Sequence, residues 1–319
     1  MALYSIVVPV YNSENSLPEL HERIANVFDN VIKEPFELIL VDDCSADNSY
    51  RVIEELRAKD KRVNGVQLAV NHGQPKAILC GFNYVQGDYV ITMDDDLQHP
   101  PEEIPKLIEK MNSADDIDVV IGEYDSKKHN AVKRMGTKLM NAMSNAVYHK
   151  SNNLKITSFR LMKRYVVDNL NKISVSRPMI GPLLLQTNKR MVNVTVTHAP
   201  RVYGKSGYSF GKLVKEFRTN LITNSDLPLK LIGYVGLLSA IMSVILILFF
   251  IIRYFVNGSG VSGWTSIIVL LLFFGGMTLF SVGILGRYLI SIMIETKKFP
   301  KFLVRKAEIT EQNKDEKDD

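Results

Sequence analysis

The chain has 319 residues, 46% of them hydrophobic and 23% charged, and its formal net charge is +5. This is enough material for one sizeable core and an additional element, which excludes a small domain held together by disulfides. The positive charge is modest but unevenly placed, because basic residues gather around 127–138, 201–230 and 297–306. A membrane surface or phosphate-bearing ligands would each explain such clusters, and we expect no nucleic-acid partner.

Short β-rich segments alternate with amphipathic helical patterns as far as about residue 228. The expected strands are residues 5–10, 36–41, 63–70, 89–93 and 119–122. This alternation predicts an α/β domain with a mostly parallel, Rossmann-like sheet wrapped by helices. Cys44 and Cys80 fall in segments that we expect to be buried, so the sequence favours two core thiols in a reducing compartment. No signal peptide is expected before the first strand.

Two apolar stretches follow, residues 231–255 and 265–294, and each exceeds the about 20 residues that a bilayer crossing needs. Trp264 lies in the short connection between them and suits a membrane interface. Basic residues flank the pair on both sides: Lys212, Lys215, Arg218 and Lys230 before it, and Lys297, Lys298, Lys301, Arg305 and Lys306 after it. The positive-inside rule then predicts a multi-pass protein of the inner (plasma) membrane with both termini in the cytoplasm. A buried helical hairpin is the alternative.

Two further segments have an amphipathic pattern. Residues 210–221 are expected to lie in the headgroup plane, whereas residues 132–148 fit either that plane or packing on the sheet. The charged segment from residue 307 lacks aromatic residues and is expected to be disordered. The predicted division is therefore 1–208 for the α/β domain, 209–227 for the interface helix, 228–296 for the membrane hairpin and 297–319 for the tail.

Three consecutive aspartates follow the apolar strand at residues 89–93. Asp94 and Asp96 are two residues apart and are expected on one side, with Asp95 on the other. Ligands bind at this end of open α/β sheets, and paired carboxylates favour Mg²⁺ or Mn²⁺. The alternative is that the acids only favour the start of the next helix, where Glu102 and Glu103 already lie.

The turn after the first strand contains no glycine, which excludes both the dinucleotide-binding fingerprint and the glycine-rich phosphate loop. The second strand ends in Val41-Asp42-Asp43 and so adds carboxylates to the same edge. Asp42 could accept a hydrogen bond from a nucleobase, and Glu14 could contact the base or ribose. A turn and helix cap over residues 43–47 is the alternative.

Six motifs and the paired apolar helices together resemble the polyprenyl-phosphate glycosyltransferases of glycosyltransferase family two. That group includes dolichol-phosphate mannose synthases, bactoprenol glucosyltransferases and undecaprenyl-phosphate aminoarabinose transferases. The resemblance covers the chain up to about residue 305, and it rests on VVPVYNSENSLPEL, VDDCSADNS, NHGQPKAILCGF, DDDLQHPPEEIP, SFRLM and RVYGKSGYSF.

The resemblance implies a nucleotide-sugar-binding domain of the GT-A type and an inverting transfer of a sugar, with a UDP-hexose as the expected donor, to undecaprenyl or another polyprenyl phosphate. It implies that Asp94 and Asp96 hold Mg²⁺ or Mn²⁺ and the diphosphate. The implied donor-binding residues are Pro9, Tyr11, Glu14, Asp42, Asp95 and Gln98. Arg160 and Arg201 are implied to act on phosphate groups, and Arg134, Lys205 and Ser206 are candidates for the acceptor phosphate. For each single arginine, a contact with solvent or a lipid headgroup is the alternative.

Ser158 departs from the pattern, since many members carry a carboxylate two positions before the arginine of the FR motif. A phosphate monoester has a second pKa of about 6, so the acceptor is already ionised near neutral pH and a general base is not required. The enzyme would instead align two anionic partners and neutralise their charge with cations.

Three other functions remain possible from the sequence. Processive polysaccharide synthases resemble one another in a Q-x-x-R-W acceptor motif. This function is disfavoured because the only tryptophan of the chain, Trp264, lies outside the α/β domain. A membrane scaffold or transporter subunit would not need carboxylates at several strand ends. A regulatory homologue with weak activity is compatible with Ser158. The sugar, the polyprenol and the pathway stay open, and small residues at 275–276 and 283–286 would permit a homo-oligomer.

Overall fold

The computed structural model describes residues 2–124, most of 154–200, scattered positions between 232 and 256, and residues 263–296 and 300–310. Residues 174, 176, 177, 198 and 200 are not among those described. The chain divides into two compact units, one formed by Met1–Ser206 together with Phe299–Asp319 and the other by Gly207–Lys298.

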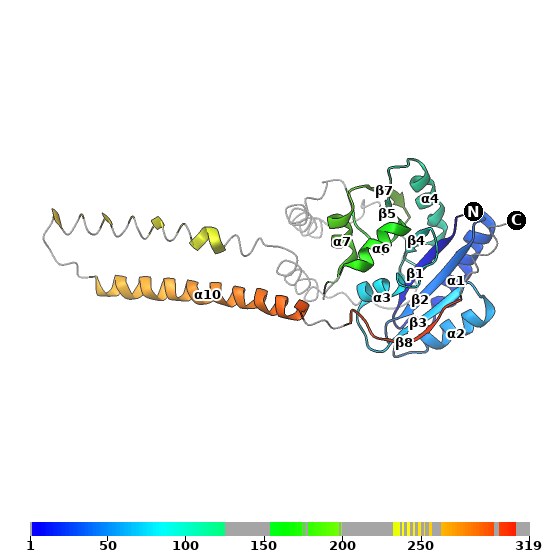
Figure 1. The fold of residues 1–319 in the computed structure, drawn as a ribbon, viewed down its shortest axis with the longest axis horizontal. Coiled ribbons are helices and arrows are strands. Elements are labelled where there is room, and N and C mark those ends of the chain that lie inside the picture. The colour runs from blue at the N-terminus through cyan, green and yellow to red at the C-terminus, as the bar shows by residue number, and fades with distance from the viewer. Residues whose placement is uncertain are drawn as a thin grey trace. The chain divides into compact units, whose positions relative to one another are not determined.

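In the described part of the first unit, eight strands form one sheet in the order β7-β5-β6-β4-β1-β2-β3-β8 (Figure 1). The strands are β1 (Tyr4–Val10), β2 (Phe36–Asp42), β3 (Val63–Leu68), β4 (Tyr89–Thr92), β5 (Val119–Tyr124), β6 (Arg160–Lys163), β7 (Met191–Val196) and β8 (Val304–Glu308). The central strands β4, β1, β2 and β3 run parallel, and β5 and β7 also form a parallel pair. The strands β6 and β8 pair antiparallel to their neighbours.

Helices cover both faces of the sheet (Figure 1). They are α1 (Leu17–Asn26), the π-helical turn η1 (Val27–Ile32), α2 (Ser49–Lys59), α3 (Gln74–Gly81), the 3-10 turn η2 (Pro101–Glu103), α4 (Ile104–Asn112), α6 (Arg164–Lys172) and α7 (Ile180–Thr187). Every residue of β1 and β2 is buried, which explains why these strands are near-continuous apolar runs.

Alternate residues of the strands supply two separate cores. Ile6 and Leu38 pack with α1, α2 and α4 on one face, whereas Val7 and Ile39 pack with α3, α6 and α7 on the other. Gly81 lets α3 approach the sheet closely, because a Cβ atom there would lie 2.5 Å from a methyl group of Val7. The prediction of a mostly parallel α/β domain is therefore confirmed.

Several predicted boundaries are wrong by one or more residues. β3 ends at Leu68 instead of residue 70, and β4 ends at Thr92 instead of residue 93, with the three aspartates after it as expected. The expectation of disorder from residue 307 is wrong for residues 307–310, since β8 includes residues 304–308 and pairs with β3. The segment 300–310 consequently belongs to the α/β unit and is not a separate tail.

The two cysteines differ in their surroundings. Cys80, on α3, is fully buried in the core, as expected, but Cys44 is exposed and the expectation of a second core thiol is wrong. Cys44 has a φ of 58° in the turn after β2, and this turn carries its side chain out of the core.

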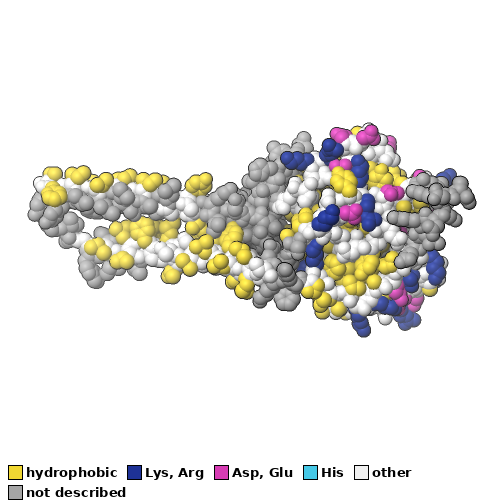
Figure 2. All heavy atoms as spheres, viewed as in Figure 1, with side chains coloured by type: hydrophobic (Ala, Val, Ile, Leu, Met, Phe, Trp, Pro, Cys, Tyr) yellow, Lys and Arg dark blue, Asp and Glu magenta, His cyan; other side chains and the backbone are white. Residues whose placement is uncertain are grey.

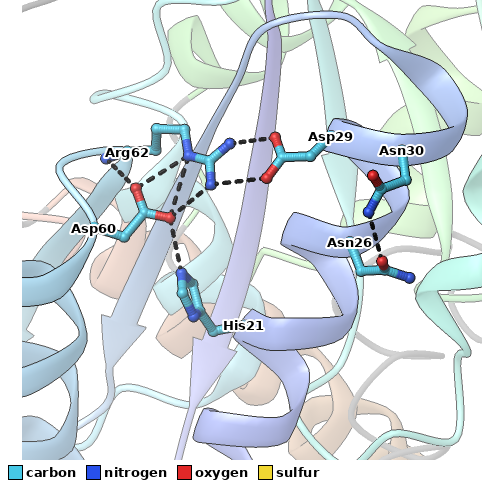
Figure 3. A network of polar contacts seen from close by, with 6 residues as sticks. All are labelled: His21, Asn26, Asp29, Asn30, Asp60 and Arg62. Carbon is cyan, nitrogen blue, oxygen red and sulfur yellow. Dashed lines mark hydrogen bonds and ion pairs between the residues drawn. The ribbon is translucent and has the colours of Figure 1, made fainter.

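A network of charged groups joins the elements around α1, α2 and the start of β3 (Figure 3). Arg62 binds Asp29 with a shortest distance of 2.6 Å and Asp60 at 2.9 Å, and His21 contacts the same Asp60 carboxylate at 3.0 Å. Burial acts to raise the pKa of Asp60, but hydrogen bonds from Arg62 and His21 outweigh it and lower the pKa to about 2. In the same region, the Asn30 side-chain amide on η1 donates to Asn26 Oδ1 at the end of α1, at 2.7 Å.

The second unit contains α10 (Trp264–Thr296), which includes one stretch, Phe273–Ile290, that is long and apolar enough to cross a membrane. Its described large apolar side chains are mostly exposed, and Figure 2 shows hydrophobic groups along this helix. In the other predicted crossing, residues 231–255, about half of the positions are described, and those positions are helical. The two amphipathic segments, 132–148 and 210–221, lie entirely outside them.

Candidate active site

The loops that follow β1, β2, β3 and β4 are joined to one another by hydrogen bonds at the carboxyl edge of the parallel strands. The N–H of Asn12 donates to Ser45 Oγ at 3.0 Å, and the N–H of Tyr11 donates to Asp95 Oδ2 at 3.1 Å. Ligands bind at this edge in open α/β sheets, so these loops form the candidate site.

The loop after β1 packs on the start of α2. Both the N–H and the side-chain amide of Asn48 donate to Glu14 Oε2, at 2.9 and 3.0 Å. The Ser13 N–H donates to Ser49 Oγ at 2.8 Å. Glu14, a predicted donor-binding residue, therefore holds the start of α2, while Tyr11 is 52% exposed.

Asp42 and Pro9 lie at the ends of their strands and are buried. The Asp42 carboxylate accepts the N–H of Ser45 at 3.2 Å and the side-chain amide of Gln67 at 3.5 Å. Burial raises the pKa of Asp42, and the hydrogen bonds from Ser45 offset part of that effect. The contact with Ser45 is the turn-type interaction that the sequence left open, and a nucleobase contact by Asp42 stays a prediction.

Asp95 ties the acidic loop to the loop after β1. Its Oδ2 accepts the Tyr11 N–H at 3.1 Å and the Ser13 hydroxyl at 2.5 Å. Burial raises the pKa of Asp95 to about 6, and the neighbouring charges of Asp94 and Asp96 add to the shift. Asp95 thus joins the acidic loop to the loop after β1.

Asp94 is held through both of its carboxylate oxygens. The Gln74 side-chain amide donates to Oδ1 at 2.6 Å, and the Ser158 hydroxyl donates to Oδ2 at 2.7 Å. The side chain nevertheless remains 26% exposed and accessible to a ligand.

A buried histidine supports the backbone of the same residue. The Asp94 N–H donates to His99 Nδ1 at 3.3 Å. The His99 ring is stacked between Phe159 and Tyr124, with centroid distances of 5.4 and 5.7 Å. This stack fixes the ring plane, so the Asp94 backbone is anchored to Tyr124 on β5 and to Phe159 just before β6.

The donor atoms at this loop fit a hard divalent cation. In the described part of the chain, no three His, Cys, Asp or Glu side chains gather closely enough to hold a metal by themselves. Asp94 and Asp96 are both partly exposed, and Asp96 Oδ1 accepts the Gln98 N–H at 3.1 Å. One or two carboxylates completed by substrate phosphates and water is the usual set for Mg²⁺, and it suits Mn²⁺ as well.

Arg160 places a buried positive charge next to the acidic loop. The residue is only 6% exposed, and its Nε and Nη1 atoms are buried without a hydrogen-bond partner among the described residues. Burial lowers the pKa of Arg160 to about 10, and the nearby Asp94 charge opposes that shift. The group is therefore charged at neutral pH, and a buried donor of this kind favours an anionic ligand.

Ser158 occupies the position where the resemblance leads us to expect a carboxylate. Its backbone carbonyl accepts the Thr92 hydroxyl at 2.7 Å, and its own hydroxyl donates to Asp94. Ser158 therefore supports a candidate metal ligand.

The structure thus brings together Tyr11, Glu14, Asp42, Asp94, Asp96 and Arg160 at one edge of the sheet, with Pro9, Asp95 and Gln98 beside them. Arg134, Arg201, Lys205 and Ser206 lie outside the described residues. Gln74 and His99 were not predicted as site residues, although each lies inside a motif that carries the resemblance. Only their long-range hydrogen bonds show that they hold Asp94.

Comparison with known proteins gives matches over most of the chain. Residues 5–170 match the model of Glycosyl transferase family 2. The undecaprenyl-phosphate 4-deoxy-4-formamido-L-arabinose transferase of Proteus mirabilis (strain HI4320) is 33% identical over 99% of this chain and 97% of its own length. The uncharacterized glycosyltransferase YkcC of Bacillus subtilis (strain 168) is 31% identical over 95% of this chain and 94% of its own length.

Solved structures share the fold. Glucosyl-3-phosphoglycerate synthase from Mycobacterium tuberculosis, crystallised with Mn²⁺ and UDP-glucose, aligns with a TM-score of 0.52 at 18% identity. The alignment covers 70% of this chain and 77% of that one. At this level of identity the likeness concerns the arrangement of the sheet and helices.

Proposed function

The chain belongs to glycosyl transferase family 2 and is a glycosyltransferase, and we propose that it moves a sugar from a UDP-sugar to undecaprenyl or another polyprenyl phosphate. The name of the Proteus mirabilis relative, which matches nearly the full length of the chain, supports this acceptor. The observation that carries the proposal is the carboxylate loop beside the buried guanidinium of Arg160, whose Nε and Nη1 atoms have no hydrogen-bond partner among the described residues.

The donor would bind along the loops after β1, β2 and β4. Tyr11 offers an exposed ring to the base, and Glu14 and Asp42 lie beside it. Gln98, next to Asp96 in the loop, would face the sugar. A UDP-hexose is the first donor to test, followed by a UDP-N-acetylhexosamine and the UDP form of the formamido pentose named for the relative.

Asp94 and Asp96 would hold Mg²⁺ or Mn²⁺, which supplies positive charge to the diphosphate when bound. Gln74, Ser158 and His99 keep Asp94 in place for this task. Because Asp95 Oδ2 already accepts hydrogen bonds from Tyr11 and Ser13, we propose that Asp95 shapes the loop.

The acceptor phosphate would lie against Arg160. One phosphate oxygen attacks the anomeric carbon, the bond from that carbon to the diphosphate oxygen breaks, and UDP leaves with the bonding electron pair, which inverts the configuration. No proton needs to be removed, because a phosphate monoester with a second pKa of about 6 is mostly a dianion at neutral pH. Arg160 would hold the phosphate in line and offset its charge, with Arg134, Arg201, Lys205 and Ser206 as further proposed contacts.

The acceptor is a membrane lipid, and α10 offers the element that would place the enzyme there. Its large apolar side chains are mostly exposed over a length that suits a bilayer crossing. We therefore place the catalytic domain at the cytoplasmic face of the inner membrane, with a second crossing at residues 231–255.

The test is direct transfer by the purified full-length protein in detergent. Radiolabelled UDP-sugars, undecaprenyl phosphate and Mn²⁺ should yield a label that moves into the lipid extract, and Asp96→Asn protein should yield none. Transfer of label that did not depend on added polyprenyl phosphate, or no transfer with any donor of the panel, would contradict the proposal.

A further inference from the structure

The segment after α10 is bonded to the loop that precedes α3. We name residues 300–310 the C-terminal strap. Within it, β8 pairs antiparallel with β3. Just before β8, the carbonyl of Leu303 accepts the Ala69 N–H at 2.7 Å, and the Leu303 N–H donates to His72 Nε2 at 3.1 Å.

The strap is also held at its other end and at its edge. The Thr310 N–H donates to Asn64 Oδ1 at 2.8 Å, and the Gln86 side-chain amide donates to the Thr310 carbonyl at 3.0 Å. Lys306 forms ion pairs with Glu54 at 2.7 Å and Glu308 at 3.0 Å. The backbone pairing with β3 and the hydrogen bonds of Thr310 therefore give the strap a defined register on the edge of the sheet.

The loop between β3 and α3 is fixed on the opposite side by Asp43. The backbone N–H groups of His72 and Gly73 each donate to one oxygen of the Asp43 carboxylate, both at 2.7 Å. Gly73 has a φ of 86°, a conformation that other residues rarely adopt. The next residue is Gln74, whose side chain reaches Asp94 Oδ1 at 2.6 Å.

We propose that Gln74 and His72 are positioning residues for Asp94, and that His72 transmits the register of the C-terminal strap to the candidate metal site. Gln74 on one oxygen and Ser158 on the other prevent the Asp94 carboxylate from rotating. The backbone of His72 is bound by Asp43 and its ring is bound by the strap. The position of His72 therefore fixes the position of Gln74, the first residue of α3. The metal as ligand of Asp94 rests on the proposed function, whereas the ordering of the loop does not.

The first test measures Mn²⁺ affinity of the full-length protein in the presence of UDP by electron paramagnetic resonance. Loss of a group that orients a metal ligand lowers affinity by about 10-fold to 100-fold. Gln74→Ala should therefore raise the Kd of Mn²⁺ by about 10-fold or more. His72→Phe keeps a ring but removes the acceptor for Leu303, and we expect an increase of about 3-fold or more from this indirect effect.

The double variant decides whether the two residues act in one sequence of contacts. Because His72 acts through Gln74, His72→Phe should add little to Gln74→Ala, whereas independent effects would multiply. Lys306→Ala is the matched control, since it removes ion pairs of the strap at a distance from the loop and should leave the Mn²⁺ affinity unchanged.

The second test needs no metal or substrate. Hydrogen exchange measured by mass spectrometry should show faster exchange of the peptide that contains residues 93–98 in His72→Phe and Gln74→Ala, but not in Lys306→Ala. Unchanged exchange in both variants, or normal Mn²⁺ affinity in either, would overturn the inference. If the unaltered protein bound no Mn²⁺ with UDP, the proposed function would fail, and the exchange data alone would decide the positioning role.

Discussion

Replacement of Arg160 by methionine should stabilise the catalytic domain while it abolishes transfer. Burial lowers the pKa of this arginine from its ordinary value to about 10, with Asp94 opposing the shift. At about 1.4 kcal/mol for each pKa unit, the charged guanidinium costs the folded state about 3 kcal/mol wherever the pH is below 10. Methionine keeps most of the buried alkyl length without the charge.

We expect Arg160→Met to raise the free energy of unfolding by about 1–3 kcal/mol, which corresponds to a few degrees in the unfolding temperature of a domain of this size. Transfer should fall by about 100-fold or more, because the phosphate charge would lose its buried partner. Arg164→Met is the matched control, since that residue is partly exposed and pairs with Asp168 at 2.9 Å. It should change neither quantity much.

The cysteines provide the unfolding assay. Burial raises the pKa of the Cys80 thiol to about 12, so a fluorogenic maleimide should label it only after the domain unfolds. The exposed Cys44 is first replaced by alanine to remove the background. Trp264 is unsuitable as a reporter because it lies in α10. A lower unfolding temperature together with normal turnover in Arg160→Met would refute the assignment of a strained, phosphate-binding arginine.

Three other substitutions test the remaining assignments. Asp96→Asn should abolish transfer and Mn²⁺-dependent UDP binding with an unchanged unfolding temperature, because only a charge is removed from a partly exposed side chain; near-normal turnover with Mn²⁺ would contradict the metal site. Ser158→Ala should lower the rate by about 10-fold, the effect of one hydrogen bond to a carboxylate, and a loss above about 100-fold would indicate a general base. The rate itself should rise with pH through the second ionisation of the acceptor phosphate and then level off. Asp60→Asn should lower the free energy of unfolding by about 1–2 kcal/mol at pH 7, measured by near-ultraviolet circular dichroism. Because the pKa of Asp60 is about 2 in the folded state, the difference in stability from the unaltered protein should persist above about pH 4 and shrink as the pH falls toward 2. A difference that stayed constant with pH would contradict its origin in the ion pairs.

The central sheet was predictable because its signal is local. Buried parallel strands are apolar along their whole length, and the helices between them repeat with a different period, so β1 to β5 could be placed from residue patterns alone. The acidic loop after β4 was predictable for a related reason, since carboxylates that follow a buried strand lie at the ligand-binding edge.

The antiparallel strands gave no comparable signal. β6 has only four residues, and its sequence belongs to the SFRLM motif and was not predicted to be a strand. β8 is Val-Arg-Lys-Ala-Glu, a charged sequence that suggests disorder until its pairing with β3, more than 200 residues earlier, is known. The contact of Gln74 with Asp94 could not be predicted for the same reason, because hydrogen bonds between distant loops leave no periodic pattern in the sequence.

The pairing of β8 with β3 also constrains membrane topology. Strands that share backbone hydrogen bonds must lie in the same aqueous compartment, and residues 207–298 connect β3's domain to β8. That connection must therefore cross a bilayer an even number of times or not at all. If α10 crosses once, another crossing is required before it, and residues 231–255 are the apolar stretch that the sequence offers. A protein with a single crossing would leave its last strand in the wrong compartment, so formation of the complete sheet would itself report that both crossings had been inserted.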